Sequence, residues 1–151
     1  MNFPCRVLLS RPAMMLVVLA SSLAAGNGRN FAGFYHLSNV QSDGEQVQAN
    51  MTMRLFNYSG SDLHNVAITV RELPPGNQIL AKFPLVDIWL DKSDVVIQTH
   101  LAISREEFLK WNGRTQPPVF IVFKDESGRE FHHTAQVTSH PVAEAGRETG
   151  Q

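Results

Sequence analysis

The chain has 151 residues, with 13 basic and 14 acidic residues that give a formal net charge of -1 at pH 7. This length is typical of a single domain, and the absence of any basic run argues against nucleic-acid binding, which needs a clustered cationic face. The only cysteine, Cys5, lies near the N-terminus, so the rest of the chain has no disulfide, thiolate metal ligand or cysteine nucleophile.

Residues 1–25 are predicted to form a secretory signal peptide. Arg6 and Arg11 make a weakly basic start, residues 13–20 are apolar, and small residues follow at 22–25. The apolar run is shorter than the ~20 residues that span a bilayer, so an uncleaved anchor is the alternative and no stable membrane span is expected after cleavage. We therefore expect an exported protein, periplasmic or secreted. Removal of both arginines leaves 11 basic against 14 acidic residues.

Residues 26–30 are predicted to be a spacer, residues 31–138 a single domain, and residues 139–151 a disordered tail with little apolar content. Within the domain, apolar runs bounded by turn residues predict a series of short strands. The fourth is irregular, because Pro84 interrupts it and proline cannot donate to a strand ladder. The predicted strands are 31–40, 47–57, 66–73, 79–90, 95–103, 117–124 and 130–137.

The most informative segment runs from residue 51 to residue 70. Met51, Met53 and Leu55 alternate with residues that are predicted to face the other way, and the same period of two returns at 66–70. A dense cluster of turn residues, 57–62, separates the two halves. This pattern predicts two adjacent antiparallel strands joined by a turn.

A helix start is encoded at Ser104. Its hydroxyl is placed to accept the amide hydrogen of Glu107, and the Glu107 side chain is expected to reach back to the start of the helix, as in a capping box. The predicted helix spans 106–111 and ends at Asn112-Gly113. We expect it to cross from one sheet to the other and to plug one end of the core.

Seven short strands with turn signals about every ten residues predict an all-β protein. The expected architecture is a seven-stranded antiparallel immunoglobulin-like β-sandwich, with one short helical turn between strands five and six. A small barrel is the alternative.

The stretch from Leu55 to Gly60, followed by Asn65 to Val70, resembles bacterial extracytoplasmic immunoglobulin-like and fibronectin type III-like domains. It is most similar to the cell-adhesion-related type, over about residues 47–72. Those domains share an N-x-x-G turn and a following V-x-V-x strand, since Asn and Gly tolerate the left-handed backbone of a tight turn. The resemblance implies a β-sandwich fold and a role in adhesion.

No catalytic, metal-binding or cofactor-binding set is expected, so the chain is predicted not to be an enzyme. Glu106 and Glu107 are neighbours on a helix and diverge, whereas glycoside hydrolysis needs two acids that face one cleft. Residues 59–61 lack the glycine pattern of a serine nucleophile elbow. His132 and His133 are adjacent on a predicted strand and therefore point to opposite faces.

The leading functional hypothesis is a non-enzymatic exported interaction module, serving as an adhesion, scaffold or accessory domain. It would bind another exported or envelope protein through a sheet edge or an apolar face, with Trp89, Phe120 and Val122 as the candidate partner-binding residues. The alternative is a small carbohydrate- or ion-binding module that uses Tyr58, His64 and Trp111. The identity of the partner or ligand and the oligomeric state stay open.

Overall fold

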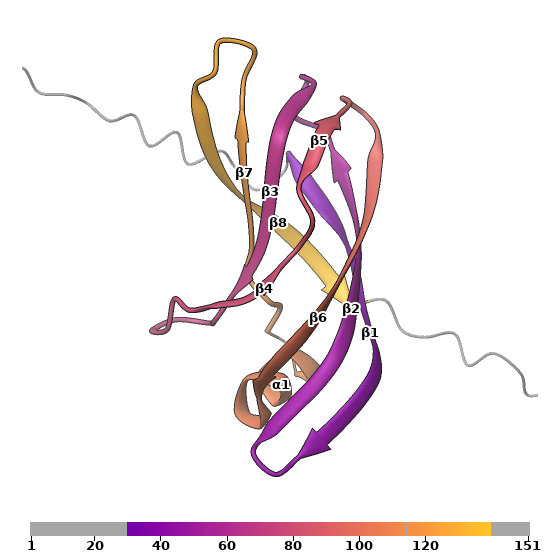
Figure 1. Ribbon diagram of the computed structural model, residues 1–151, viewed down its shortest axis with the longest axis vertical. Helices are drawn as coiled ribbons and strands as arrows, with labels where there is room; N and C mark the ends of the chain where they lie inside the picture. The colour runs from indigo at the N-terminus through magenta and orange to yellow at the C-terminus, as the bar shows by residue number, and fades with distance from the viewer. Residues whose placement is uncertain (1–29, 114, 140–151) are drawn as a thin grey trace, which may run out of the picture.

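The structure is a computed structural model that describes residues 30–113 and 115–139. The predicted signal peptide, most of the spacer and nearly all of the predicted tail lie outside these residues. Eight strands and one helix, α1 (Arg105–Asn112), follow one another along the chain (Figure 1). The strands are β1 (Phe31–Asp43), β2 (Gln46–Asn57), β3 (Leu63–Arg71), β4 (Ile79–Lys82), β5 (Val86–Trp89), β6 (Asp94–Ser104), β7 (Val119–Lys124) and β8 (Glu130–Ser139).

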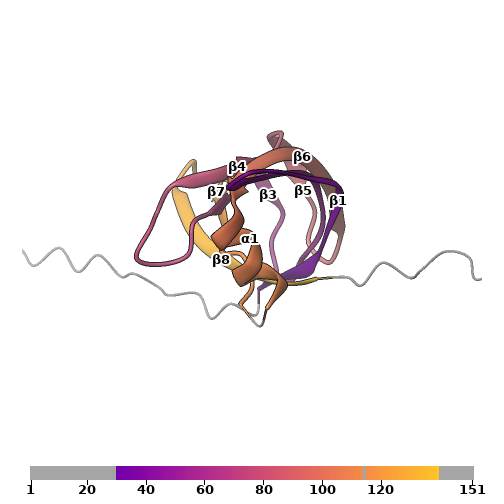
Figure 2. The same ribbon diagram turned by 90° about the horizontal axis from the view of Figure 1, so that it is seen from below.

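The strands form one sheet that is nearly closed into a barrel (Figure 2). Their order is β4-β3-β7-β8-β1-β2-β6, and β5 also pairs with β3. β8 pairs antiparallel with β7 and parallel with β1, which makes the sheet continuous. β4 and β6 are the two end strands of this order, and the Thr99 hydroxyl on β6 donates a hydrogen bond to the Lys82 carbonyl on β4 at 3.0 Å. The all-β prediction is confirmed, and the continuous sheet lies close to the barrel alternative.

The predicted pairing of the two strands in residues 51–70 is wrong. β2 pairs with β1 and β6, whereas β3 pairs with β4, β5 and β7. Residues 58–62 therefore carry the chain across the barrel instead of turning it back on itself. A period of two reports which side of a strand is buried, but it is the same for a hairpin and for a crossing connection.

Asn57 fixes this crossing, because its fully buried side-chain amide holds two loops together. Its Nδ2 donates to the carbonyls of Ser61, Trp89 and Leu90 at 3.0, 3.2 and 3.2 Å. Its Oδ1 accepts hydrogen bonds from the backbone N–H and the hydroxyl of Ser59. A buried amide needs such partners, and here they tie the 58–62 connection to the turn that follows β5.

The irregular fourth strand is confirmed as an interrupted one. β4 and β5 both pair with β3 on the same side, and Pro84 lies between them. This split is the reason that seven predicted strands become eight. A register shift in β3 between His64 and Ala67, where Asn65 has a φ of 51°, lets Leu63 and Val66 both face the core.

The core follows the predicted alternation. Met51, Met53 and Leu55 are fully buried, as are Val66 and Ile68 on the opposite wall. α1 connects β6 to β7 and caps the lower end of the barrel in Figure 1, as predicted. At the other end, referred to below as the mouth, lie the connections 58–62, 90–93 and 125–129. No helix in the part of the chain that the structure describes is both long enough and apolar enough to span a membrane.

Candidate functional site

The barrel is open beside β5. In the described part of the chain, β5 pairs only with β3 and β6 pairs only with β2. The short turn 90–93 joins these two strands, but no ladder of hydrogen bonds forms between them. Each strand therefore has one free edge, with backbone N–H and C=O groups available to another strand.

Exposed apolar side chains lie on β5, on β6 and in the segments next to β5. Leu85, Ile88, Leu90 and Val96 are between 54% and 64% exposed, and they form what is termed below the seam patch. These four residues fall within twelve positions of the chain, although the structure describes more than a hundred. A concentration of apolar side chains on a surface marks an interaction site more often than scattered ones do.

The carboxylates around the seam patch differ in what they contact. Asp94 forms an ion pair with Arg54, with 2.7 Å between Oδ2 and Nε. Asp91 accepts the backbone N–H of Gly60 at 3.0 Å. Asp87, in the middle of β5, is exposed and makes no hydrogen bond or ion pair with the described residues. The open edge therefore presents one unpaired negative charge among apolar side chains.

Trp89 is not part of this surface, and its predicted outward position is wrong. Its side chain is 1% exposed, its ring centroid lies 5.6 Å from that of Phe31, and its Nε1–H donates to the Ser93 carbonyl at 3.3 Å. Its neighbours Ile88 and Leu90 are the exposed residues of this stretch. Because Pro84 interrupts the strand, the alternation in the sequence did not determine which of these three residues faces the core.

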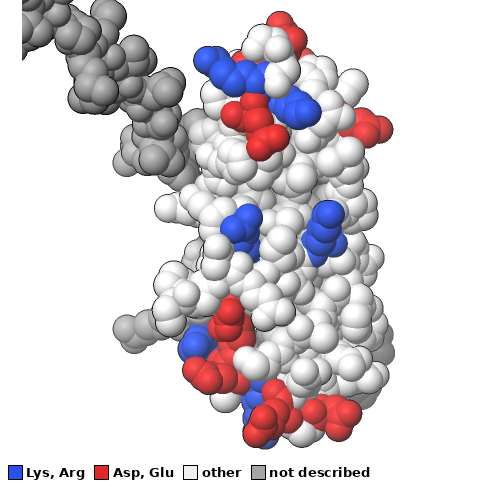
Figure 3. Space-filling view, turned by 60° about the vertical axis from the view of Figure 1, so that its left-hand side comes forward, with Lys and Arg blue, Asp and Glu red and all other residues white. Residues whose placement is uncertain are grey.

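Phe120 and Val122 lie on the outer face of β7, as predicted, but they are only half exposed. The Arg71 guanidinium covers the Phe120 ring at 4.6 Å from its centroid. One face of the molecule is shown in Figure 3, where charged side chains gather at both ends and basic ones stand without acidic neighbours in the middle. Because the Arg71 guanidinium covers its ring, Phe120 offers a partner less apolar surface than the seam patch does.

The three residues of the predicted ligand site do not meet. Tyr58 is 55% exposed at the mouth and stacks on Phe56, with 6.0 Å between ring centroids. His64 is half-buried on β3, and it lines a shallow hollow with residues of the β7–β8 connection. Trp111 lies in α1 at the far end of the barrel and is 3% exposed. A common site for all three is therefore wrong.

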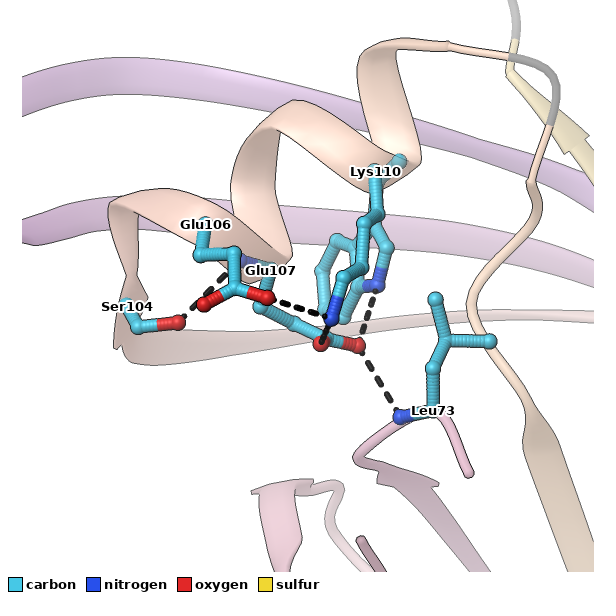
Figure 4. A network of polar contacts seen from close by, with 6 residues as sticks. Leu73, Ser104, Glu106, Glu107 and Lys110 are labelled. Atoms are coloured by element: carbon cyan, nitrogen blue, oxygen red, sulfur yellow. Dashed lines mark hydrogen bonds and ion pairs between the residues drawn. The ribbon is translucent and has the colours of Figure 1, made fainter. Parts of the chain in front are cut away.

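Trp111 instead belongs to a buried polar network between α1 and the loop after β3. Figure 4 shows Glu107 at the centre of this network. Ser104 caps α1 as predicted, since its hydroxyl accepts the Glu107 N–H at 3.1 Å. The Glu107 carboxylate does not reach back to Ser104. Its Oε1 accepts the Trp111 Nε1–H and the backbone N–H of Leu73, both at 3.0 Å, and Lys110 Nζ lies 3.8 Å from Oε2. Glu107 therefore ties the helix to the loop after β3.

The sequence interpretation missed a group of aromatic residues at the mouth. Phe123, Phe131 and His133 stack there, although they come from two strands. Burial lowers the pKa of His133 below its usual value, and the neighbouring His132 lowers this pKa further. The alternation along β8 correctly turns His132 outward and His133 inward. The signal that could have identified this group is the pairing of Phe123 with Phe131 across the β7–β8 hairpin.

No protein-family model matches the sequence, and no curated protein matches it. Among solved structures, the chain is similar to the GH20 exo-β-N-acetylglucosaminidase from Vibrio harveyi in complex with N-acetylglucosamine, with a TM-score of 0.44 and 14% identity. That similarity covers 72% of this chain and 18% of the glycosidase. The chain is also similar to Northeast Structural Genomics Consortium target SoR45, with a TM-score of 0.41 and 8% identity. This similarity covers 82% of this chain and 97% of the target. At these scores neither similarity assigns an activity.

Proposed function

We propose that this chain is an exported, non-enzymatic interaction module that binds an extended segment of another exported protein along the free edge of β5. The observation that carries the proposal is the seam patch, because it places exposed apolar side chains beside unpaired backbone groups. Strand addition at such an edge takes affinity from backbone hydrogen bonds and specificity from alternate side chains. Export rests on the predicted signal peptide.

The strand order supports an immunoglobulin-like origin for this module. β3, β7 and β8 lie side by side as strands C, F and G do in that fold, and β2 lies between β1 and β6 as strand B lies between A and E. The parallel pairing of β1 with β8 is what joins the two sheets. We therefore interpret the barrel as an immunoglobulin-like sandwich with one closed side.

The charge on β5 favours a different protein as the partner over a second copy of this chain. Antiparallel pairing of two β5 strands in the register that sets Asp87 opposite Asp87 would bring like charges together across the ladder, which is destabilising. An apolar segment with a Lys or Arg opposite Asp87 avoids this repulsion. We therefore expect the partner segment to be apolar and basic.

An Ile88→Asp substitution is expected to weaken partner binding without unfolding the protein. Ile88 is 58% exposed, so its replacement should lower the free energy of unfolding by no more than about 1 kcal/mol. A charge in the centre of an apolar contact should weaken binding at least about tenfold. Leu109→Asp is the matched control, because Leu109 is 59% exposed and lies on α1 at the far end of the barrel.

The partner can be identified by placing a photo-crosslinking amino acid at position 88 or 109 of the full-length chain in its host. We expect a defined protein adduct from position 88 and none of the same mass from position 109. The captured protein is then purified and titrated against the wild type and both aspartate variants. Equal binding by all three proteins would contradict the proposal, and an adduct of the chain with itself would replace it by a homodimer.

A further inference from the structure

A second surface, separate from the seam patch, is a cavity of about 290 Å³ in the mouth of the barrel. Asn30 and the 59–63 segment line one side of it, and residues of the β7–β8 hairpin line the other. It lies at the end opposite α1, and its lining includes no residue of the seam patch and none of the Glu107 network. Barrel mouths are common places for small-molecule sites.

One wall of this mouth pocket is an aromatic stack. The rings of Phe131 and Phe123 lie 5.5 Å apart between centroids at an interplanar angle of 17°, and those of Phe123 and His133 lie 5.4 Å apart at 13°. With its lowered pKa, His133 is a neutral ring at neutral pH and adds no positive charge to the stack. Faces of aromatic rings attract cations.

Carboxylates complete the lining. Asp125 is held ionised, because hydrogen bonds from the Ser127 hydroxyl and from the backbone of Arg129 and Ser127 lower its pKa. Asp62 Oδ1 accepts the backbone N–H of Asp91 at 2.8 Å. Asp62 Oδ2 makes no hydrogen bond with the described residues. The lining of the pocket therefore combines aromatic side chains with negative charge.

The protein itself already uses this combination at the rim of the pocket. The Arg129 guanidinium lies 4.8 Å from the centroid of the Phe131 ring, and its Nη2 is 3.4 Å from Asp125 Oδ2. The Arg129 side chain is 73% exposed and is not among the residues that line the pocket, so it does not fill the pocket. His133 and Asp62 also line the pocket, and they provide an aromatic ring and a carboxylate to a cation from outside.

We propose that the mouth pocket binds an organic cation, and that it prefers a planar guanidinium to a compact ammonium group. The aromatic wall and the free oxygen of Asp62 are the two groups that recognise it. A guanidinium group fits this wall better because it is planar, stacks on rings and is weakly hydrated, whereas an ammonium group is a strongly hydrated point charge. The volume suits a small molecule or the end of a larger one.

The test is a nuclear magnetic resonance titration of the purified full chain with methylguanidinium chloride. N-methylurea is the neutral control of nearly the same shape, methylammonium chloride tests the preference for a planar group, and sodium chloride controls for ionic strength. We expect saturable shifts at Ser61, Phe131 and His133 with methylguanidinium, weaker binding of methylammonium, and no saturation with N-methylurea. Equal responses to methylguanidinium and N-methylurea would overturn the proposal.

Two charge-removing variants locate the site. Asp62→Asn retains the oxygen that accepts the Asp91 N–H but removes the charge, and it should weaken methylguanidinium binding about three- to fivefold. Glu126→Gln removes one charge from the same end of the barrel without touching the aromatic pocket, so its binding should stay close to that of the wild type. Equal weakening by both variants would show that only the general negative charge of the mouth attracts cations, and the site would be wrong.

Discussion

A Trp89→Ala substitution is expected to lower the free energy of unfolding by about 3–5 kcal/mol, the range found when a large aromatic side chain is deleted from a core. Trp89 is among the largest fully buried side chains, and it packs against Phe31 where the chain enters β1. Its loss also removes the hydrogen bond to the Ser93 carbonyl, which helps to hold the turn between β5 and β6. The substitution would therefore destabilise both the core packing and the turn at the mouth.

Ile88→Ala is the matched control for this prediction, because it removes an apolar side chain from the adjacent position on the exposed side of β5. We expect a loss below about 1 kcal/mol for Ile88→Ala. Guanidinium unfolding followed by far-ultraviolet circular dichroism measures both variants without relying on tryptophan fluorescence. Similar losses for the two variants would mean that the inward position of Trp89 is wrong.

The second large effect is expected for Glu107→Ala, with a loss of about 2–4 kcal/mol. The substitution leaves the Trp111 Nε1–H and the Leu73 N–H without their acceptor in a buried setting, and unsatisfied buried donors cost more than the net value of a hydrogen bond. Glu107→Gln keeps an oxygen that can accept both hydrogen bonds, so its loss should be near 1 kcal/mol.

Glu106→Gln separates this network from ordinary surface charge. Glu106 forms a 3.0 Å ion pair with Lys110, but its side chain is 80% exposed, and such pairs contribute little to stability. We expect a change below about 0.5 kcal/mol, measured by the same unfolding experiment. If Glu106→Gln and Glu107→Ala destabilise the protein equally, the stabilising contribution comes from helix charge and not from the link to Leu73.

Local features of this fold could be predicted because the sequence encodes them locally. The burial of Met51, Met53 and Leu55 follows from strand periodicity, and the Ser104 cap follows from helix-start chemistry. The direction of the Glu107 carboxylate could not be predicted, because its acceptor role depends on Leu73, which lies 34 positions away.

The candidate sites depended even more on contacts between distant residues. The mouth pocket brings residues 59–63 against Phe123 and His133, and nothing in the sequence between them records this proximity. Trp89 illustrates a local difficulty. Because the strand is interrupted near Pro84, the sequence does not determine which alternate residues face the core. One residue of shift exchanges the buried and exposed sets, so the apolar surface was predicted in the right segment but assigned to the wrong side chain.

The parallel pairing of the first and last strands gives the barrel a direction in which it should resist tension. β1 and β8 run the same way, with Ala32 opposite Gln136 and Tyr35 opposite Ser139, so the start of β1 and the end of β8 leave this pair at opposite ends. A stretching force applied through those two points would load the hydrogen bonds between the strands in shear, all at once, instead of opening them one by one. A domain that is held at both ends while its partner pulls would keep its shape until that whole set of bonds broke together.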